Sequence, residues 1–301
     1  MEMIKVGCCG YAAATKKYHE TFMLVELNST FYQYPKMATV EGWRKKAPDN
    51  FEFTVKAHQD ISHKYKLTME EPCLQAFEKM KEICKTLKAR ILLIQTPASF
   101  KPDNLGTAKE FFHRVNRENL CLIWETRGSA WNASPLKEKL AEVLREENVT
   151  HVTDPFVVMP AFVGDIVYFR LHGLGKQMYY YQYTDEELKR LHALVKPFED
   201  KGKEVYVLFN NLSMFDDAFR FKEFLEKGKF PKITDVVGLE SVRKIVEKTR
   251  YPTTKALLMK RVGWKLAELE ENRQVRLEEL LKELPSKKYN NAEEVLREIK
   301  L

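Results

Sequence analysis

The sequence predicts an α/β protein: a (β/α)8 TIM-like barrel followed by a small all-helical module at the C-terminus. Short apolar runs alternate with longer helical segments, and this alternation is typical of a parallel sheet. Eight such units over about 230 residues are the right size for a closed barrel. An open doubly wound sheet is the competing fold, but the glycine-rich GxGxxG turn that often follows its first strand is absent.

The strands are predicted where apolar residues cluster over a few positions. In chain order they are Ile4–Cys8, Met23–Leu27, Phe51–Val55, Ile91–Ile94, Leu120–Trp124, His151–Thr153, Ile166–Leu171 and Glu204–Phe209. Helices are predicted between them at Thr39–Lys46, Ala76–Leu87, Thr107–Val115, Ser134–Glu146, Asp185–Val195 and Asp216–Glu226. Ser134-Pro135 and Thr184-Asp185-Glu186 have the composition of helix starts, a capping hydroxyl followed by proline or acids.

The pattern changes after Pro231, and we place a domain boundary between residues 1–234 and 235–301. The second segment is rich in lysine and glutamate and shows no further strand pattern. Thr253 or Thr254 is a candidate N-cap for one helix, Arg273–Leu284 has apolar residues on one helical face, and Asn291 is a candidate cap for the last helix.

Composition indicates a soluble protein of a reducing compartment, which we place in the cytoplasm. The chain has 301 residues, five cysteines without a CxxC pair, and no apolar run approaching a membrane span. Abundant lysine and glutamate with only 12 glycines resemble the composition of heat-adapted proteins. A formal net charge of +7 favours anionic ligands, either small phosphorylated metabolites or nucleic acid, although a solvated lysine-rich surface gives the same number.

Polar residues follow nearly every predicted strand, at the end where barrel proteins bind their ligands. Polar strand ends are also expected simply because strands end where water begins. We nominate as catalytic Glu26, Glu125 and His172. We nominate as substrate-binding Asn28, Lys56, Gln95, Arg127, Trp131, Arg170 and Asn210.

Three of these nominations rest on local pattern. Glu26 interrupts an apolar strand, so its carboxylate either pairs with Lys56 or Arg170 or acts as a general acid. Glu125 and Arg127 share a strand face, so they form either a mutual ion pair or a grip on an anionic group. His172 shares a face with Arg170 and is either a proton shuttle or a structural histidine.

The residues leave the cofactor unknown, with a divalent metal as an open alternative. Oxygen and nitrogen ligands would come from Glu26, Glu125, Asp154, His172 and His58. Their spacing along the chain specifies no metal, and neither a GxSxG elbow nor a Walker loop is present.

Several ordered motifs resemble the YecE-like family, also called domain of unknown function 72. They are Val25–Tyr32 (VELNSTFY), Phe51–Ala57 (FEFTVKA), Ile61–His63, Leu93–Phe100 (LIQTPASF), Glu125–Arg127 with Trp131, Tyr168–Gly173 (YFRLHG) and Tyr206–Asn211. The resemblance covers about residues 4–230 and implies a TIM-like barrel, while the activity of the family is not established. It also implies a role for Glu26, Asn28, Lys56, Gln95, Glu125, Arg127, Arg170, His172 and Asn210. The chain departs from the family pattern at Gly7–Tyr11 and at Gly128.

The C-terminal segment resembles a second module, domain of unknown function 2795. The resemblance rests on Tyr251–Lys255, Leu284-Pro285 and Tyr289–Val295. It implies a docking surface at residues 235–301 for a protein partner rather than chemistry.

Three functions follow as alternatives. The first is a hydrolase- or isomerase-type enzyme acting on an anionic substrate, for example a sugar phosphate or phosphodiester, at the C-terminal mouth of the barrel. The second is a nucleic-acid-binding or nuclease-like protein, for which a basic face should run from the barrel mouth onto residues 235–301. The third is a non-catalytic binding or scaffold protein that uses the C-terminal segment.

Overall fold

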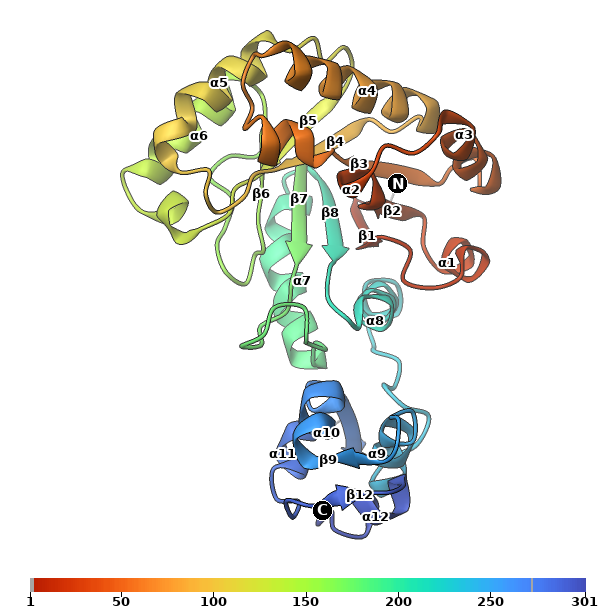
Figure 1. Ribbon diagram of the computed structural model, residues 1–301. Helices are drawn as coiled ribbons and strands as arrows, with labels where there is room; N and C mark the ends of the chain where they lie inside the picture. The colour runs from red at the N-terminus through yellow and green to blue at the C-terminus, as the bar shows by residue number, and fades with distance from the viewer. Residues whose placement is uncertain (1–2, 272) are drawn as a thin grey trace. The chain divides into compact units, whose positions relative to one another are not determined.

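The computed structural model describes residues 3–271 and 273–301 and contains eight parallel strands in one sheet (Figure 1). The strands are β1 (Ile4–Cys9), β2 (Leu24–Leu27), β3 (Glu52–Lys56), β4 (Ile91–Gln95), β5 (Cys121–Glu125), β6 (Thr150–Val152), β7 (Ile166–Leu171) and β8 (Glu204–Phe209). Each of the eight predicted apolar runs lies on one of them, so the strand prediction is confirmed.

The sheet closes on itself. Its hydrogen-bonded order is β6-β5-β4-β3-β2-β1-β8-β7. The gap between the first and last strand is bridged by the parallel pair Thr153 and Phe169, and the Arg170 amide donates to the Thr153 carbonyl over 3.0 Å. The predicted TIM-like (β/α)8 barrel is therefore confirmed, and the open sheet is excluded.

Helices lie between successive strands along the chain, except between β6 and β7, which are joined by a loop (Figure 1). They are α1 (Thr15–Thr21), α2 (Ser29–Tyr32), α3 (Met37–Lys46), α4 (Glu71–Leu87), α5 (Leu105–Arg114), α6 (Leu136–Glu146), α7 (Asp185–Glu199) and α8 (Met214–Lys227), with short helical turns at Asp60–Lys64, Pro102–Asn104 and Ser129–Asn132. The predicted start of α7 is a capping box, because the Glu187 amide donates to the Thr184 hydroxyl (3.2 Å) and the Thr184 amide donates to the Glu187 carboxylate (2.9 Å).

The chain divides into two compact units. One contains the residues up to Leu171 together with Leu191–Asn210, and the other contains His172–Arg190 and Asn211–Leu301. The barrel sheet belongs to the first unit. Within the described residues no helix is both long and apolar enough to cross a membrane.

The barrel interior is layered along its axis. Its middle is apolar, with Leu24, Ile91, Leu93 and Ile123 packed around the stacked rings of Tyr168 and Tyr206. A charged network fills the end where the strands begin: Lys5 contacts Glu52 (2.5 Å) and Glu204 (2.8 Å), and Arg90 contacts the same two carboxylates. Two cations thus contact two carboxylates at this end of the barrel, so the charges balance and the network has a structural role.

The C-terminal region contains α9 (Leu239–Val246), β9 (Thr253–Thr254), α10 (Lys255–Val262), β10 (Leu266–Glu270), β11 (Arg273–Arg276), α11 (Leu277–Leu281), β12 (Lys288–Tyr289) and α12 (Ala292–Leu296). Two of the predicted caps are present: the Thr254 hydroxyl accepts from the Leu257 amide, and the Asn291 side chain accepts from the Glu294 amide. The helices enclose a core of their own that includes Val242, Leu258 and Leu277.

The prediction that this region is all helical is wrong. Strand β10 pairs antiparallel with β11, and β9 pairs with β12. The predicted helix Arg273–Leu284 is therefore a strand followed by the short helix α11. The extended conformation of Arg276 is stabilised by contacts distant in sequence, since its guanidinium donates to the carbonyls of Gln182 and Trp264.

Candidate functional site

The C-terminal ends of the barrel strands bring most of the nominated residues into one layer. Because the strands are parallel, residues at equivalent heights lie side by side on the inner face. The register places Cys9 beside Glu26 and Gln95 beside Glu125. We call the group Glu26, Lys56, Gln95, Glu125, Arg127 and Arg170 the mouth cluster.

Arg170 is the centre of the mouth cluster. Its side chain is buried, and it bonds the Glu26 carboxylate through Nε (3.1 Å) and Nη2 (2.8 Å). Its Nη1 donates to Glu125 over 2.5 Å. Of the two partners that the sequence left open for Glu26, the structure selects Arg170. Such bidentate geometry fixes the guanidinium and both carboxylates in place.

Glu125 also contacts Arg127, with 2.6 Å between its Oε1 and the Arg127 Nε. This is the mutual ion pair that the shared strand face allowed. Arg127 is the more accessible member of the pair, with 22% of its side chain exposed against 5% for Glu125. An anion approaching the mouth cluster can therefore meet Arg127 without displacing Arg170 from its two carboxylates.

Lys56 is buried and bonds a neutral group. Its Nζ donates to the Gln95 Oε1 over 2.7 Å and lies 3.9 Å from the centre of the Phe31 ring. Burial, with the Arg170 charge as a second cause, lowers the pKa of Lys56 from 10.5 to about 8, against the opposing attraction of Glu125 and Glu26. Lys56 is thus a lysine that can exchange protons near neutral pH.

Three further residues belong to this layer but were not among the nominations. The Tyr168 hydroxyl donates to Glu26 over 2.9 Å and lies 2.7 Å from the Thr54 hydroxyl. Cys9 lies against Glu26 and Arg170, and burial raises the pKa of its thiol well above the usual value. Strand alternation was the signal that could have found two of them, because Tyr168 precedes Arg170 by two positions and Thr54 precedes Lys56 by two.

The remaining nominated residues lie in different surroundings. Asn28 is half-buried, and its side chain accepts a long contact of 3.5 Å from Arg170. Trp131 is buried against Phe100 and Trp124, and its indole N–H donates to the Phe100 carbonyl over 3.1 Å. The Asn210 amide donates to the Leu171 carbonyl.

His172 is buried and belongs to the second compact unit. Its carbonyl accepts a hydrogen bond from the Tyr179 amide over 3.0 Å. The next residue, Gly173, has φ +93°, and a Cβ at that position would lie 2.4 Å from the Tyr181 Cβ. Glycine is therefore required by a close contact within the protein as well as by its backbone conformation. A catalytic role for His172 stays a prediction.

The residues nominated for a metal have other contacts in the structure. Glu26 and Glu125 bond Arg170, as described above. His58 stacks on Tyr34 with ring centres 3.8 Å apart, and its Nδ1 lies 3.2 Å from Asp60. Asp154 accepts a hydrogen bond from the Phe156 amide. Across residues 3–271 and 273–301, no group of three or more His, Cys, Asp or Glu side chains is arranged to hold a metal ion.

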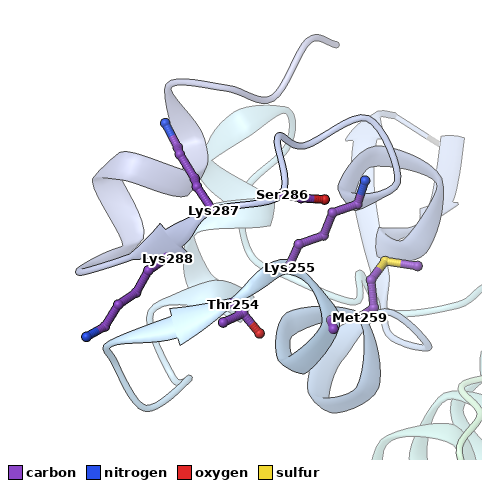
Figure 2. Close-up of a pocket in the computed structure, with 7 residues that line it drawn as sticks. Thr254, Lys255, Met259, Ser286, Lys287 and Lys288 are labelled. Atoms are coloured by element: carbon purple, nitrogen blue, oxygen red, sulfur yellow. The ribbon is translucent and has the colours of Figure 1, made fainter.

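The C-terminal region has a pocket of its own, with a volume of about 550 Å³ (Figure 2). Its walls are Thr254, Lys255, Ala256, Met259, Ser286, Lys287 and Lys288. Figure 2 shows that Lys287 and Lys288 leave the chain in opposite directions. Lys287 bonds Glu298, and Lys255 donates to the Lys282 carbonyl, whereas no acidic residue is among the described residues that line the pocket.

A closed parallel barrel with charged groups converging at the C-terminal ends of its strands defines the class of TIM-like barrel proteins. The chain belongs to the DUF72 family, described as proteins of unknown function, whose model matches residues 10–235. The family resemblance seen in the sequence motifs is thereby confirmed. The resemblance of the C-terminal segment to domain of unknown function 2795 stays a prediction.

Relatives agree with this assignment. The chain is similar to the UPF0759 protein YunF of Bacillus subtilis (strain 168), with 26% identity over 267 residues, 74% of this chain and 94% of that protein. It is similar to the structure of a DUF72 family protein of Enterococcus faecalis V583, with TM-score 0.63, 24% identity, and coverage of 75% and 98% of the two chains. A DUF72 family protein of Thermotoga maritima MSB8 gives TM-score 0.60 at 24% identity, with coverage of 75% and 100%. These structural likenesses show the fold.

Proposed function

We propose that the protein is an enzyme of hydrolase or isomerase type that binds a small anionic substrate at the mouth cluster. One observation carries the proposal: the cluster contains three cations, Lys56, Arg127 and Arg170, against two carboxylates, Glu26 and Glu125. An anion that enters the cluster would balance the positive excess. This composition differs from the opposite end of the barrel, where two cations face two carboxylates.

The roles within the cluster follow from exposure and bonding. Arg127, the partly exposed cation, is suited to meet the anionic group of the substrate. Glu125 lies between Arg127 and Arg170 and is suited to acid–base chemistry next to a bound anion. Glu26 is fully buried and bonded by Arg170 and Tyr168, which suits it to positioning Arg170.

Anions should raise the melting temperature of the protein through Arg127. At a ligand concentration one hundred times the dissociation constant, stabilisation by about 2.7 kcal/mol is expected. We would measure thermal unfolding with inorganic phosphate, sugar phosphates and dicarboxylates, and repeat the measurement on Arg127→Gln, which should lose most of the shift. Arg243→Gln is the matched control, since Arg243 is 26% exposed and ion-paired but lies in the C-terminal region. If no anion shifts the wild type, or if Arg127→Gln retains the full shift, the proposal fails.

A second candidate function is the binding of nucleic acid by the C-terminal region. The pocket there is lined by Lys255, Lys287 and Lys288 with two hydroxyl side chains, and this set favours phosphate oxygens. A protein partner at residues 235–301 is the alternative use of the same surface.

Nucleic-acid binding would show in the salt dependence of affinity. Changing Lys255, Lys287 and Lys288 to Gln should reduce the slope of log affinity against log salt by about 2 to 3 for an oligonucleotide, since each phosphate contact contributes about 0.7 to 0.9. The control changes Lys85, Lys88 and Lys101, three exposed lysines of the barrel, and should alter the slope little. Equal slopes for the two triple variants would exclude the pocket as the binding site.

A further inference from the structure

We propose that Lys56 is a nucleophile, and that the substrate of the mouth cluster is a small anionic aldehyde or ketone with which its amine forms an imine. The inference rests on the proposed function, because it names the substrate class and a further reacting group of the same site.

The contacts of Lys56 leave its amine without a carboxylate partner. Glu26 is bonded by Arg170 and Tyr168, and Glu125 by Arg170 and Arg127. Among the ion pairs of the described residues, those within 4.0 Å do not include Lys56, whose acceptor is the neutral Gln95 amide. Lys5, at the opposite end of the barrel, has two carboxylates within 2.8 Å. Of these two barrel lysines, Lys56 is therefore the one whose proton can be lost without breaking an ion pair.

The surroundings of Lys56 favour the neutral amine, which is the nucleophilic form. Burial is the largest cause that lowers the pKa of Lys56 to about 8, and the neighbouring Arg170 and Arg127 cations act in the same direction. At pH 7.5 roughly a quarter of the molecules then carry a neutral Lys56, whereas an ordinary exposed lysine is neutral in about one molecule in a thousand. Desolvation beside a second cation is a recognised way to activate a lysine.

The reaction needs no oxidant or reductant. The lone pair of the neutral Lys56 Nζ forms a bond to the carbonyl carbon as the carbonyl π bond breaks, and one amine proton is transferred to the oxygen, giving a carbinolamine. The carbon–oxygen bond then breaks, the hydroxyl leaves as water with the second amine proton, and a carbon–nitrogen double bond forms. The imine withdraws electrons from the adjacent carbon, which supports proton removal there and so favours the isomerase type of the proposed function. Arg127, within the same cluster, would hold the anionic group of the substrate.

Reductive trapping tests the proposal. The full-length protein would be incubated with glyoxylate, an aldehyde bearing a carboxylate, or with uncharged propanal, in the presence of cyanoborohydride, and modified lysines would be located by peptide mass spectrometry. At pH 7.5 Lys56 should be modified at least about tenfold faster than the exposed Lys64, which serves as an internal reference. The ratio of Lys56 to Lys64 modification should fall as pH rises above about 8, because the neutral fraction of Lys56 then levels off while that of Lys64, whose pKa is raised by its contact with Tyr65, is still increasing.

The outcomes distinguish the proposal that Lys56 forms an imine from the proposal that the mouth cluster binds an anion. With Arg127→Gln, trapping by glyoxylate should fall by a larger factor than trapping by propanal, because the propanal reaction loses only the lowering of the Lys56 pKa that Arg127 provides. If anions shift the melting temperature through Arg127 but Lys56 is modified no faster than Lys64, the imine proposal is overturned and the proposed function stands. If Lys56 reacts rapidly but equally with glyoxylate and propanal, in the wild type and in Arg127→Gln, the nucleophile stands and the anionic substrate class is overturned.

Discussion

Replacing Arg170 by methionine is expected to lower the free energy of unfolding by about 3 to 5 kcal/mol. Arg170 is 1% exposed, and its guanidinium bonds the buried Glu26 and Glu125 carboxylates. Methionine fills much of the same volume but leaves Glu26 as a buried charge with no cation bonded to it, beside the neutral Tyr168 hydroxyl and Cys9 thiol. The loss of stability therefore comes more from burying the unpaired Glu26 carboxylate than from losing its attraction to Arg170. Chemical denaturation at pH 7 measures it.

Two further measurements distinguish this cause from a simple packing defect. Adding Glu26→Gln to Arg170→Met should recover part of the loss, because the second change removes the stranded charge. The deficit of Arg170→Met should also shrink below pH 7, because a buried carboxyl without a cation takes up a proton more readily. The control Arg243→Met, at a partly exposed ion pair, should change stability by only about 0.5 kcal/mol. A loss below 1 kcal/mol for Arg170→Met, or one that Glu26→Gln deepens, would contradict the argument.

The barrel could be predicted from the sequence because its strands carry a strong local signal. A parallel barrel buries both faces of each strand, so runs such as Ile91–Ile94 and Leu122–Trp124 are apolar without interruption. The C-terminal strands carry no such signal. Strand β11 consists of Arg273, Gln274, Val275 and Arg276, and these residues are also compatible with one face of a helix. Pairing with β10 decides the conformation, and that information is not local.

The sequence predicted which residues lie together at the ends of the strands, but not which of them bond to one another. Position at a strand end was sufficient to nominate Glu26, Lys56 and Glu125. The choice of Arg170 over Lys56 as the partner of Glu26 depends on strand register and side-chain reach across the barrel, which the sequence leaves open. For the same reason the lone hydrogen bond of Lys56 to Gln95 became visible only in the structure.

Replacing Lys56 by methionine is expected to stabilise the protein, by about 2 kcal/mol at pH 7. The pKa of Lys56 is lowered from 10.5 to about 8 in the folded protein, an interval that corresponds to about 3 kcal/mol disfavouring the buried ammonium. Methionine removes that cost and loses one hydrogen bond to Gln95, which contributes about 1 kcal/mol.

The stabilisation by Lys56→Met should decrease as pH rises. Between pH 8 and 10.5 the unfolded chain binds more protons at Lys56 than the folded protein does, so the stability of the wild type gains from this group as pH rises through that window. The advantage of Lys56→Met should therefore be full below about pH 8 and be gone before pH 10.5, where only the lost hydrogen bond to Gln95 remains. Lys5→Met is the matched control, because Lys5 lies between two carboxylates at the other end of the barrel and its loss should destabilise. If Lys56→Met is less stable than the wild type at pH 7, or if its advantage persists at pH 10.5, then burial does not disfavour the Lys56 ammonium and the prediction is wrong. If the prediction holds, Lys56 lowers the stability of the folded protein. Its presence at the mouth of the barrel is then explained by a chemical role and not by a contribution to stability.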